Sequence, residues 1–545
     1  MSTNISKKKR DDLLEKIKQI RAFIAAAPQD ENTGNLLSYL SELEKDVNGK
    51  KYGLVFEEHR EEIDEVLDTH TPVLTEEADL FIDHGGQMNF LLEGDNLAAL
   101  KLLEKTHRGK IDLIYIDPPY NLGEDFIYSD HYVGREDSFK HSKWLSFMSS
   151  RLRIAYRLLA SKGAIFISIN DAEYAGLKML CDSMWGDENY QATLIWKSRQ
   201  RADSRNISML STDHEYILVY GKSSTFRLLG KEKDKTKYRN SDNDPRGPWA
   251  SIDLSGLADA SRRPNLHFDI IDPKTGNVYP PNPNRGWSKS KETIERMIAE
   301  NRILWPSSPK GRPREKKFLT SLLSDKTGFS SVLDSEEVGY TTDGTRALID
   351  VLGNKVFNFP KSVKLIKAIV HQYPDTDCTI LDFFAGSGTT GHAVMKLNAE
   401  DGGTRRFILC TNNENGICRD VTYERIRRVI DKEDYAASLK YYKIDYVPIS
   451  DRMYYEYADE LLRHIRELVE LENGINFTGN EEIAIVLTED ELATFIADKD
   501  RFAKCRRLYM GHDLLPDEEQ EAALFKNKID VSIIPDYYYR DLQEG

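Results

Sequence analysis

The chain has 545 residues, 40% of them hydrophobic, which is enough for two to four globular domains. Its five cysteines lack paired spacing, no apolar stretch approaches the ~18 residues of a membrane span, and no apolar segment follows the basic N-terminus; these features argue against a disulfide framework, a zinc site, a membrane protein and a secreted protein, and they favour the cytoplasm. The net charge of −15 argues against a nucleic-acid partner for the whole surface, but residues 196–320 carry 25 lysines and arginines against 15 aspartates and glutamates, which leaves a DNA-binding segment and ordinary surface charge equally open.

The N-terminal region, residues 1–85, is expected to be helical. Leucines and isoleucines fall on one stripe between residues 13 and 24, and leucines and a valine recur at spacings of four, three and four between residues 36 and 47. This pattern predicts a helical hairpin, and a hairpin that covers its own domain is favoured over a dimerisation device.

Strands and helices alternate between residues 86 and 220. The expected strands are 90–92, 111–116, 164–169, 194–197 and 216–220, and the expected helices are 96–106, 144–159 and 172–185. Strands that alternate with helices predict an α/β fold with a doubly wound, parallel sheet.

Residues 221–350 break this alternation. They are rich in proline, glycine, asparagine, lysine and arginine over a length that is typical of a functional insert or of disorder, and their aromatic residues argue against simple disorder. Basic side chains interleaved with aromatic ones suit contacts with phosphates and bases, although each taken singly is an ordinary surface residue. The candidates for DNA contact are Arg246, Trp249, Arg262, Arg263, Arg285, Trp287, Lys310, Arg312 and Arg314.

Regular structure is expected again from residue 351. Residues 351–445 read as helix 361–371, strand 379–383, helix 390–398, strand 407–410 and helix 419–430. Residues 446–545 form a last region, with a helix over 454–471 and short α/β elements such as 483–487 and 531–534.

The first of two signature motifs, Asp117-Pro118-Pro119-Tyr120, ends strand 111–116. The Asp117 carboxylate and the Pro118 carbonyl can accept hydrogen bonds from an exocyclic amine, and proline offers no competing N–H. Tyr120 can stack on a base that has been withdrawn from a duplex. We interpret all four residues as catalytic. A strand that merely ends in a proline-rich turn is the alternative, and the second motif weakens it.

The second motif ends strand 379–383, and its Asp382 lies 265 positions after Asp117. Glycines let the backbone approach a ligand, Asp382 can bind an ammonium group, and Thr389 with Thr390 can cap the next helix. A glycine-rich turn alone would suit any dinucleotide fold. The candidate cofactor residues are Asp382, Phe384, Ala385, Gly386, Ser387, Gly388 and Thr389; Glu414 for ribose hydroxyls, or as a surface glutamate; Asp95 for an adenine ring, or as a helix N-cap; and Lys361 with Ser362 for a carboxylate, or as a helix start.

Together the two motifs resemble those of S-adenosylmethionine-dependent amino-methyltransferases, and their order resembles the circularly permuted β class that acts on DNA. Over residues 35–445 the chain is similar to the methyltransferase (Mod) subunits of type III restriction-modification systems, in segments 90–96, 114–121, 125–128, 141–148, 165–171, 214–220 and 243–249. The resemblance implies a Rossmann-like fold with a target-recognition insert at 221–350 and N6-adenine methylation of duplex DNA. It also implies S-adenosylmethionine as the methyl donor, a homodimer, and a separate helicase-nuclease restriction subunit.

Other functions stay open at this point. N4-cytosine methylation shares the exocyclic-amine chemistry, but that family usually has serine in place of Asp117. C5-cytosine methylation needs a nucleophilic cysteine, and the chain contains no Pro-Cys dipeptide. A DNA-binding specificity subunit with an inert methyltransferase fold is the non-enzymatic alternative.

Overall fold

The computed structural model describes residues 5–26, 33–48, 54–122, 139–204, 209–308, 310–449 and 459–534. It divides the chain into two compact units, one formed by Met1–Arg227 with Ser331–Gly545 and the other by Leu228–Ser330. The first unit is called the main unit below, and the second is called the insert unit. Each has its own core.

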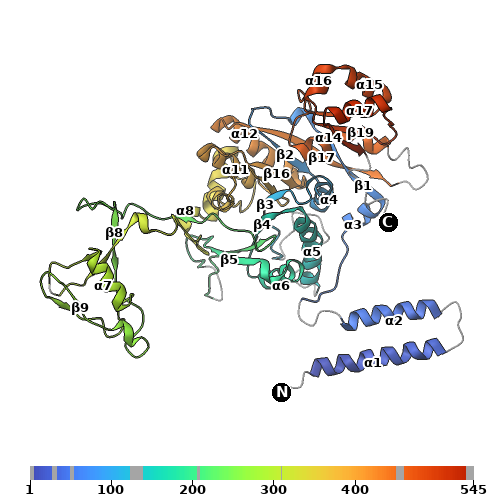
Figure 1. Ribbon diagram of the computed structural model, residues 1–545. Coiled ribbons are helices and arrows are strands. Elements are labelled where there is room, and N and C mark those ends of the chain that lie inside the picture. Colours follow the sequence, from blue (N-terminus) through green and yellow to red (C-terminus); the bar gives the residue numbers. More distant parts are fainter. Residues whose placement is uncertain are drawn as a thin grey trace. The chain divides into compact units, whose positions relative to one another are not determined.

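A ten-stranded sheet organises the main unit, with the strand order β1-β17-β2-β16-β15-β3-β4-β6-β5-β14 (Figure 1). Its strands are β1 (His70–Glu76), β2 (Gln87–Glu93), β3 (Ile111–Ile116), β4 (Leu159–Ile169), β5 (Tyr190–Trp196), β6 (Glu215–Gly221), β14 (Val332–Leu333), β15 (Thr379–Asp382), β16 (Arg406–Thr411) and β17 (Ala437–Pro448). Strand β3 is buried at five of its six positions, as a strand covered on both faces of a sheet must be.

The predicted α/β class is confirmed, but the expectation of an all-parallel sheet is wrong. The strands from β17 to β4 run parallel, whereas β6 is antiparallel to both β4 and β5, and β1 is antiparallel to β17. The segment between β5 and β6 contains no helix in the part that the structure describes, and without a crossover helix the chain returns in the opposite direction.

Helices cover the sheet. The helices of this layer are α4 (Asn96–His107), α5 (Lys140–Leu158), α6 (Tyr174–Trp185), α10 (Val363–Val370), α11 (Thr389–Asp401), α12 (Glu424–Glu433) and α14 (Ile465–Asn473). Helix α5 packs against α4 and α6, and α10 packs against α11. A π-helical turn, Ile417–Tyr423, precedes α12 where the sequence predicted one continuous helix.

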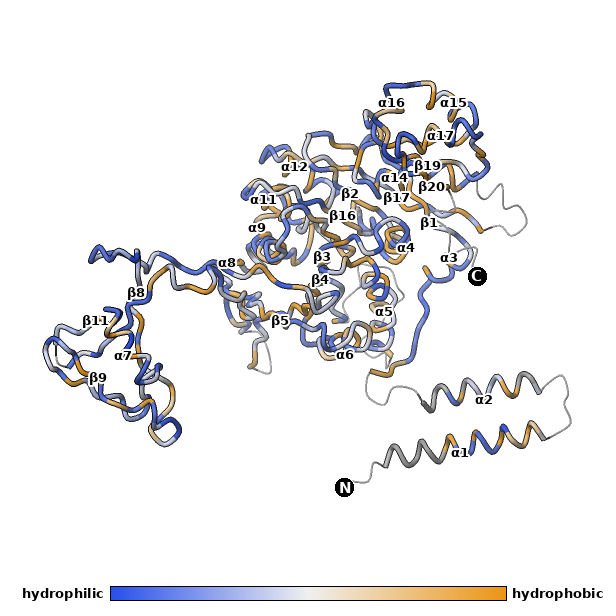
Figure 2. The backbone as a smooth tube through the Cα atoms, in the orientation of Figure 1, coloured by the Kyte–Doolittle hydropathy of each residue, from blue (hydrophilic) through white to orange (hydrophobic). Residues whose placement is uncertain are grey.

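The N-terminal region is only partly helical. Helices α1 (Ile5–Ala26) and α2 (Thr33–Asn48) contact each other, and the coloured parts of both contain hydrophobic as well as hydrophilic residues (Figure 2). Helix α3 (Glu62–Thr69) leads directly into β1, which joins the edge of the large sheet. The expected helical region 1–85 therefore ends in a strand.

The insert unit lies within the segment predicted to be a target-recognition region, residues 221–350. That segment also contains α8 (Ser335–Val338) and α9 (Thr341–Leu352), which belong to the main unit. The short strands of the insert unit are β7 (Lys231–Glu232), β8 (Trp249–Asp253), β9 (Ile270–Ile271), β10 (Val278–Tyr279), β11 (Ile303–Leu304), β12 (Arg314–Phe318) and β13 (Lys326–Thr327), with helix α7 (Lys291–Ala299). Its small apolar core includes Leu254, Ile270, Tyr279, Trp287, Ile294, Met297 and Ile303.

The C-terminal region of the main unit has a small parallel sheet of its own. Strands β18 (Ile483–Val486), β19 (Arg507–Gly511) and β20 (Asp530–Ile534) are accompanied by α15 (Glu489–Ala497), α16 (Lys499–Lys504) and α17 (Glu518–Lys526). The helix expected over 454–471 is described only from residue 459, and its first part lies outside the described residues. Among the helices that the structure describes, none is both long and apolar enough to cross a membrane.

Candidate active site

The two signature motifs meet at the centre of the large sheet. Strands β3 and β15 are parallel neighbours, with Leu113 opposite Ile380 and Ile114 opposite Leu381. The next strand after β3 lies on one side of this pair and the next strand after β15 lies on the other, so the sheet changes winding direction between them. In open α/β sheets, a crevice that can hold a ligand forms at such a point, beyond the carboxyl ends of the strands.

A cavity of about 300 Å³ occupies this position. Residues from both motifs line it, and so do aromatic residues from the segment before α10. The lining residues are Tyr115, Asp117, Pro118, Pro119, Tyr120, Asn121, Leu122, Phe357, Phe359, Pro360, Lys361, Asp382, Phe384, Ala385, Gly386, Ser387, Thr389, Thr390, Thr411 and Ile417. The cavity therefore brings together all four predicted catalytic residues and most of the predicted cofactor residues.

The glycines in the second motif allow the turn to pack closely against other residues of the protein. Gly386 and Gly388 have φ angles of 50° and 72°, a region that favours glycine. A Cβ atom on Gly386 would lie 3.2 Å from the Phe357 ring, and one on Gly388 would lie 3.1 Å from a Thr422 methyl carbon. The glycines thus permit close packing of the turn, and Gly388 itself does not line the cavity.

Asp382 is buried at the end of β15. Its carboxylate accepts a hydrogen bond from the Phe384 N–H at 3.0 Å and another from the Thr390 hydroxyl at 2.5 Å. Burial raises the pKa of Asp382 to about 7. The expected threonine cap is absent, since α11 starts at Thr389 without a side-chain cap and the Thr390 hydroxyl donates to Asp382 instead.

Arg425 supports the same turn and was missed by sequence reasoning. This fully buried guanidinium donates from Nη1 to the Ser387 carbonyl at 3.0 Å and to the Thr389 hydroxyl at 2.8 Å. Burial lowers the pKa of Arg425 to about 9. Arg425 lies on the buried stripe of α12, beside Ile426 and Val429. An arginine at a core position of an amphipathic helix is the signal that could have identified it.

Neighbouring elements hold the turn that begins at Asp117, after β3. The Trp144 indole N–H of α5 donates to the Pro119 carbonyl at 2.7 Å. Asn121, whose φ is 55°, donates from its side chain to Glu173, a buried carboxylate that also contacts His141 at 2.6 Å. The turn is therefore fixed by α5 and by the segment before α6.

Four polar side chains, with that of Asp117 among them, meet beyond the end of β3. Lys361 Nζ lies 2.9 Å from Asp117 Oδ1, 2.9 Å from Glu215 Oε2 and 2.8 Å from the Tyr120 hydroxyl. The Tyr120 hydroxyl is in turn 2.8 Å from Asp117 Oδ1 and 2.9 Å from Glu215 Oε2. Lys361 thus contacts the turn at Asp117, whereas the sequence suggested a role toward a cofactor carboxylate. We call Asp117, Tyr120, Glu215 and Lys361 the carboxylate cluster.

Charge and burial shift the pKa values in this cluster in different directions. Burial raises the pKa of Asp117; Lys361 opposes that rise and Glu215 adds to it. Burial alone would also raise the pKa of Glu215, but the Lys361 ammonium lowers it below its ordinary value. Burial opposes the charged form of Lys361, yet the two carboxylates together raise its pKa. The geometry therefore favours one ammonium held between two carboxylates.

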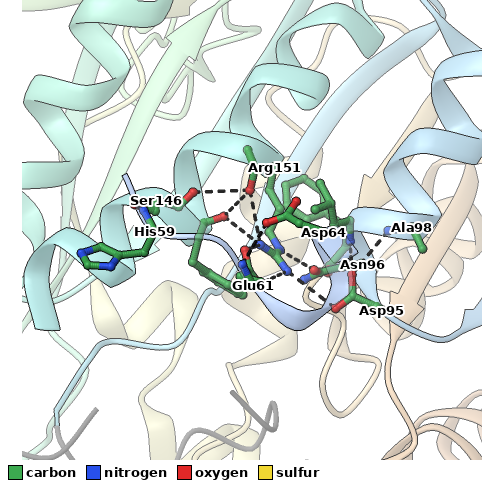
Figure 3. Close-up of polar contacts among 12 residues, drawn as sticks. His59, Glu61, Asp64, Asp95, Asn96, Ala98, Ser146 and Arg151 are labelled. Carbon is green, nitrogen blue, oxygen red and sulfur yellow. Dashed lines mark hydrogen bonds and ion pairs between the residues drawn. The ribbon is translucent and has the colours of Figure 1, made fainter. Parts of the chain in front are cut away.

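The remaining cofactor candidates lie away from the cavity lining. Figure 3 shows Asp95 as the N-cap of α4, where it accepts from the first amides of the helix at 2.7 and 3.4 Å and lies 3.6 Å from Arg151. Ser362 is buried and donates to the Val338 carbonyl at 2.7 Å. Glu414 starts a short 3-10 turn after β16 and is partly exposed.

Arg151 connects Asp95 and Asn96 of α4 to the turn after β15. Its Nε atom donates to Asn96 at 2.5 Å, and its Nη atoms bind both oxygens of Glu61 at 2.5 and 2.9 Å (Figure 3). Asn96 donates onward to the Phe383 carbonyl at 3.1 Å. This buried network ties the turn at Phe383 to α4, to α5 and to the segment before α3.

Two aromatic residues at the cavity were also missed. Phe359 is 75% exposed and has a φ of 53°, which is rare for a residue with a bulky side chain. Phe357 packs over Gly386. Strained, exposed residues cluster at ligand sites. The pair of phenylalanines just before Pro360 and Lys361 is the only signal that the sequence offered.

The DNA-contact candidates fall into three groups in the insert unit. Trp287 is wrong as an exposed contact, because it is 1% exposed and its indole N–H donates to the Phe268 carbonyl within the core. Arg246 pairs with Asp244 at 2.8 Å, and the Trp249 indole donates to Asp242 at 2.8 Å. Arg246 is exposed as well, and the other exposed candidates are Arg262, Arg263, Arg285, Lys310, Arg312 and Arg314. Residues 228–330 carry 20 basic and 13 acidic side chains, a net charge of +7.

The chain matches a protein-family model and also individual proteins of known name. A family model described as DNA methylase matches residues 111–423. The Type III restriction-modification enzyme StyLTI Mod subunit of Salmonella typhimurium is 34% identical over 63% of this chain and 57% of its own length. Type II methyltransferase M.KpnI of Klebsiella pneumoniae is 34% identical over 65% of this chain and 90% of its own length. The chain thus spans little more than half the length of the Mod subunit that it matches.

Solved structures match more distantly. The PvuII DNA methyltransferase, described as cytosine-N4-specific, has a TM-score of 0.33 and 12% identity over 66% of this chain and 96% of its own. A complex of M1.HpyAVI with SAM has a TM-score of 0.31 and 14% identity over 62% of this chain and 98% of its own. At these scores the fold assignment rests on the observed sheet rather than on the likeness.

Proposed function

Since the chain belongs to the DNA methylase family, we propose that it transfers a methyl group from S-adenosylmethionine to the N6 amine of an adenine in duplex DNA. One observation carries the proposal: the Asp117 turn and the Asp382 turn line the same cavity, at the point where the sheet changes winding direction. A base and a methyl donor must share one site, because methyl transfer requires the two reacting atoms in line and close together.

The cavity residues fit the chemistry of S-adenosylmethionine. Asp382, a buried carboxylate on the lining, suits the ammonium of the methionine moiety, and Gly386 lines the cavity beside it. Phe384 and Ile417 offer apolar contacts. When bound, the cofactor supplies a methyl group on a positively charged sulfur. We also keep Glu414 as the proposed partner of the ribose hydroxyls.

The Asp117 turn suits the amine. Every hydrogen bond that the structure describes at Asp117 ends on Oδ1, which leaves Oδ2 for an amine donor. The Pro119 carbonyl is occupied by Trp144, so the neighbouring Pro118 carbonyl is the second proposed acceptor. If Asp117 and Pro118 each accepted a hydrogen bond from one N–H of the amine, the nitrogen lone pair would be less delocalised into the ring. The lone pair would then be available to attack the methyl group. The Tyr120 ring, fixed through its hydroxyl, is the proposed stacking surface for the base.

We propose the insert unit as the DNA-reading part. Its net charge of +7 contrasts with the acidic whole chain, and its exposed arginines suit phosphate contacts, which need only local positive charge. Because a base inside a duplex cannot enter the cavity, the target adenine would have to be flipped out of the stack.

We further propose that the chain acts in the cytoplasm as the homodimeric modification subunit of a type III-like restriction-modification system. Support comes from relatives whose names describe Mod subunits of type III enzymes. A separate restriction subunit would then carry any DNA cleavage.

The test is to sequence DNA from a methylation-free host that expresses the chain, with a method that reports modified bases. N6-methyladenine at one motif on one strand is the expected result, and Asp117→Ala should abolish it while cofactor binding persists. N4-methylcytosine would replace the substrate assignment. Absence of any modified base in the presence of a restriction-subunit partner would favour the inert DNA-binding alternative.

A further inference from the structure

Glu215 is the member of the carboxylate cluster to which the sequence assigned no role. It is the first residue of β6, the strand that runs antiparallel between β4 and β5. Its side chain is 17% exposed and reaches Lys361 Nζ and the Tyr120 hydroxyl, each at 2.9 Å. The direction of β6 therefore places a second carboxylate beside the catalytic one.

In the carboxylate cluster, the Lys361 ammonium is shared between the carboxylates of Asp117 and Glu215. Lys361 lies at the same distance, 2.9 Å, from an oxygen of Asp117 and from an oxygen of Glu215. The Tyr120 hydroxyl has a single hydrogen and two carboxylate acceptors within 2.9 Å, while Lys361 donates to its oxygen. If Glu215 were neutral, Lys361 would be the undivided counter-ion of Asp117.

Among the residues that the structure describes, the other titratable groups that face Asp117 do not alter this balance. Tyr115 of β3 interacts with the Asp117 charge from the preceding strand, and Asp382 of β15 interacts with it from the neighbouring one. Tyr115 is neutral and donates or accepts a hydrogen bond with Ser168 at 2.8 Å. Asp382 adds only negative charge. Lys361 is thus the cation that would neutralise Asp117, and Glu215 is the group that competes for it.

We propose that Glu215 is a positioning residue for methyl transfer: it holds Lys361 and the Tyr120 hydroxyl away from full pairing with Asp117, so that Asp117 keeps the negative charge needed to accept the amine hydrogen bond. This inference rests on the proposed function, because it assigns Asp117 to the amine. An acceptor that is already neutralised by an ammonium binds a further donor more weakly. The pKa directions agree, since Glu215 raises the pKa of Asp117 and Lys361 lowers it.

Three variants test the idea. Glu215→Gln removes the competing charge and keeps the side-chain shape, Lys361→Met removes the shared ammonium, and Asp213→Asn is a matched charge control two positions away, where the carboxylate accepts from Ser211. The first readout is the pH profile of kcat for methylation. The second is independent of activity: the pH dependence of carbodiimide labelling of the Asp117 carboxyl, located by peptide mass spectrometry. Carbodiimide reacts with protonated carboxyls, so the labelling profile follows the titration of Asp117.

The expected shifts have opposite signs. In Glu215→Gln the labelling profile and the acid limb of kcat move to lower pH, and the plateau kcat falls by about tenfold or more, with little change in KM for DNA. In Lys361→Met the labelling profile moves to higher pH. Asp213→Asn matches the unmodified protein in both readouts.

Two results would overturn the inference. One is a Glu215→Gln protein whose labelling profile and kcat match those of the unmodified protein. The other is a loss of kcat without any shift in either profile, which would indicate a merely structural contact. Failure of the proposed function looks different: the unmodified protein would then methylate no DNA, while the labelling profiles would still report whether Glu215 and Lys361 act on Asp117 in opposite directions.

Discussion

Replacing Asp382 with asparagine should stabilise the cofactor-free protein while weakening cofactor binding. Burial holds the pKa of this carboxyl at about 7, against an ordinary value of 3.8. The sign follows from proton linkage: the folded state binds the Asp382 proton more tightly than the unfolded state, so the cost of burying Asp382 grows as the pH rises from about 4 to about 7 and is constant above that range. Asparagine carries no charge and avoids this cost.

The magnitude follows from the same two values. The difference is about three pH units, and each unit corresponds to about 1.4 kcal/mol, so the cost of the ionised carboxylate at pH 8 is about 4 kcal/mol. The gain in free energy of unfolding for Asp382→Asn should therefore increase by about 3 kcal/mol between pH 5 and pH 8. The loss of one of the two hydrogen bonds at this carboxylate lowers the gain by a similar amount at every pH and does not affect the increase.

The assay is urea unfolding of the cofactor-free protein at pH 5, 6, 7 and 8, with the exposed Asp377 changed to asparagine as the control. Calorimetric titration with S-adenosylmethionine at pH 8 gives the second half of the prediction, a loss of affinity of about tenfold or more when a charged partner of the ammonium is removed. A stability difference that does not vary with pH would refute the burial argument. Full affinity in the variant would refute the assignment of Asp382 to the ammonium.

The remaining predictions concern contacts around the site and on the insert unit. Trp144→Phe removes the donor to the Pro119 carbonyl in the turn that we propose to be catalytic, so we expect kcat to fall while urea unfolding shows a loss of only about 1 kcal/mol; an unchanged kcat would mean that the turn holds its shape without this bond. Glu61→Gln leaves Arg151 buried without its main counter-charge, and the loss of stability should be about 3 kcal/mol by thermal or urea unfolding, where a loss below about 1 kcal/mol would contradict the pairing. Arg262→Ala and Arg263→Ala should each reduce the slope of log affinity against log salt by about one in fluorescence anisotropy with duplex DNA, and an unchanged slope would remove that arginine from the proposed phosphate contacts.

Local pattern was sufficient for the central strands and for the meeting of the two motifs. The strand over 111–116 was predicted with its observed bounds, because an uninterrupted apolar run bounded by polar residues is typical of a strand covered on both faces. The Asp117 and Asp382 turns were both placed at strand ends, and parallel neighbours bring such ends to one edge of a sheet. Strand direction was not predictable in the same way, since β6 has the same composition whether it runs parallel or antiparallel to β4.

Two side-chain roles were also not predictable from local pattern, because they depend on contacts between distant parts of the chain. Lys361 was assigned to a cofactor carboxylate from its place before the predicted cofactor strand, but its observed partners lie 146 and 244 positions earlier in the chain, at Glu215 and Asp117. Trp287 was assigned to DNA contact because it lies among basic residues in the sequence. The sequence does not distinguish a tryptophan that fills a small core, as Trp287 does, from one that faces solvent.

The sequence by itself determined the family, the α/β class and the residues of the two turns, because these depend on short-range patterns: apolar runs, glycines and polar groups placed directly after a strand. The tertiary structure decided which charges meet. Glu215, Lys361 and Arg425 reach the site from separate elements, and electrostatic interaction depends on the distance between groups in space, which no spacing along the chain contains.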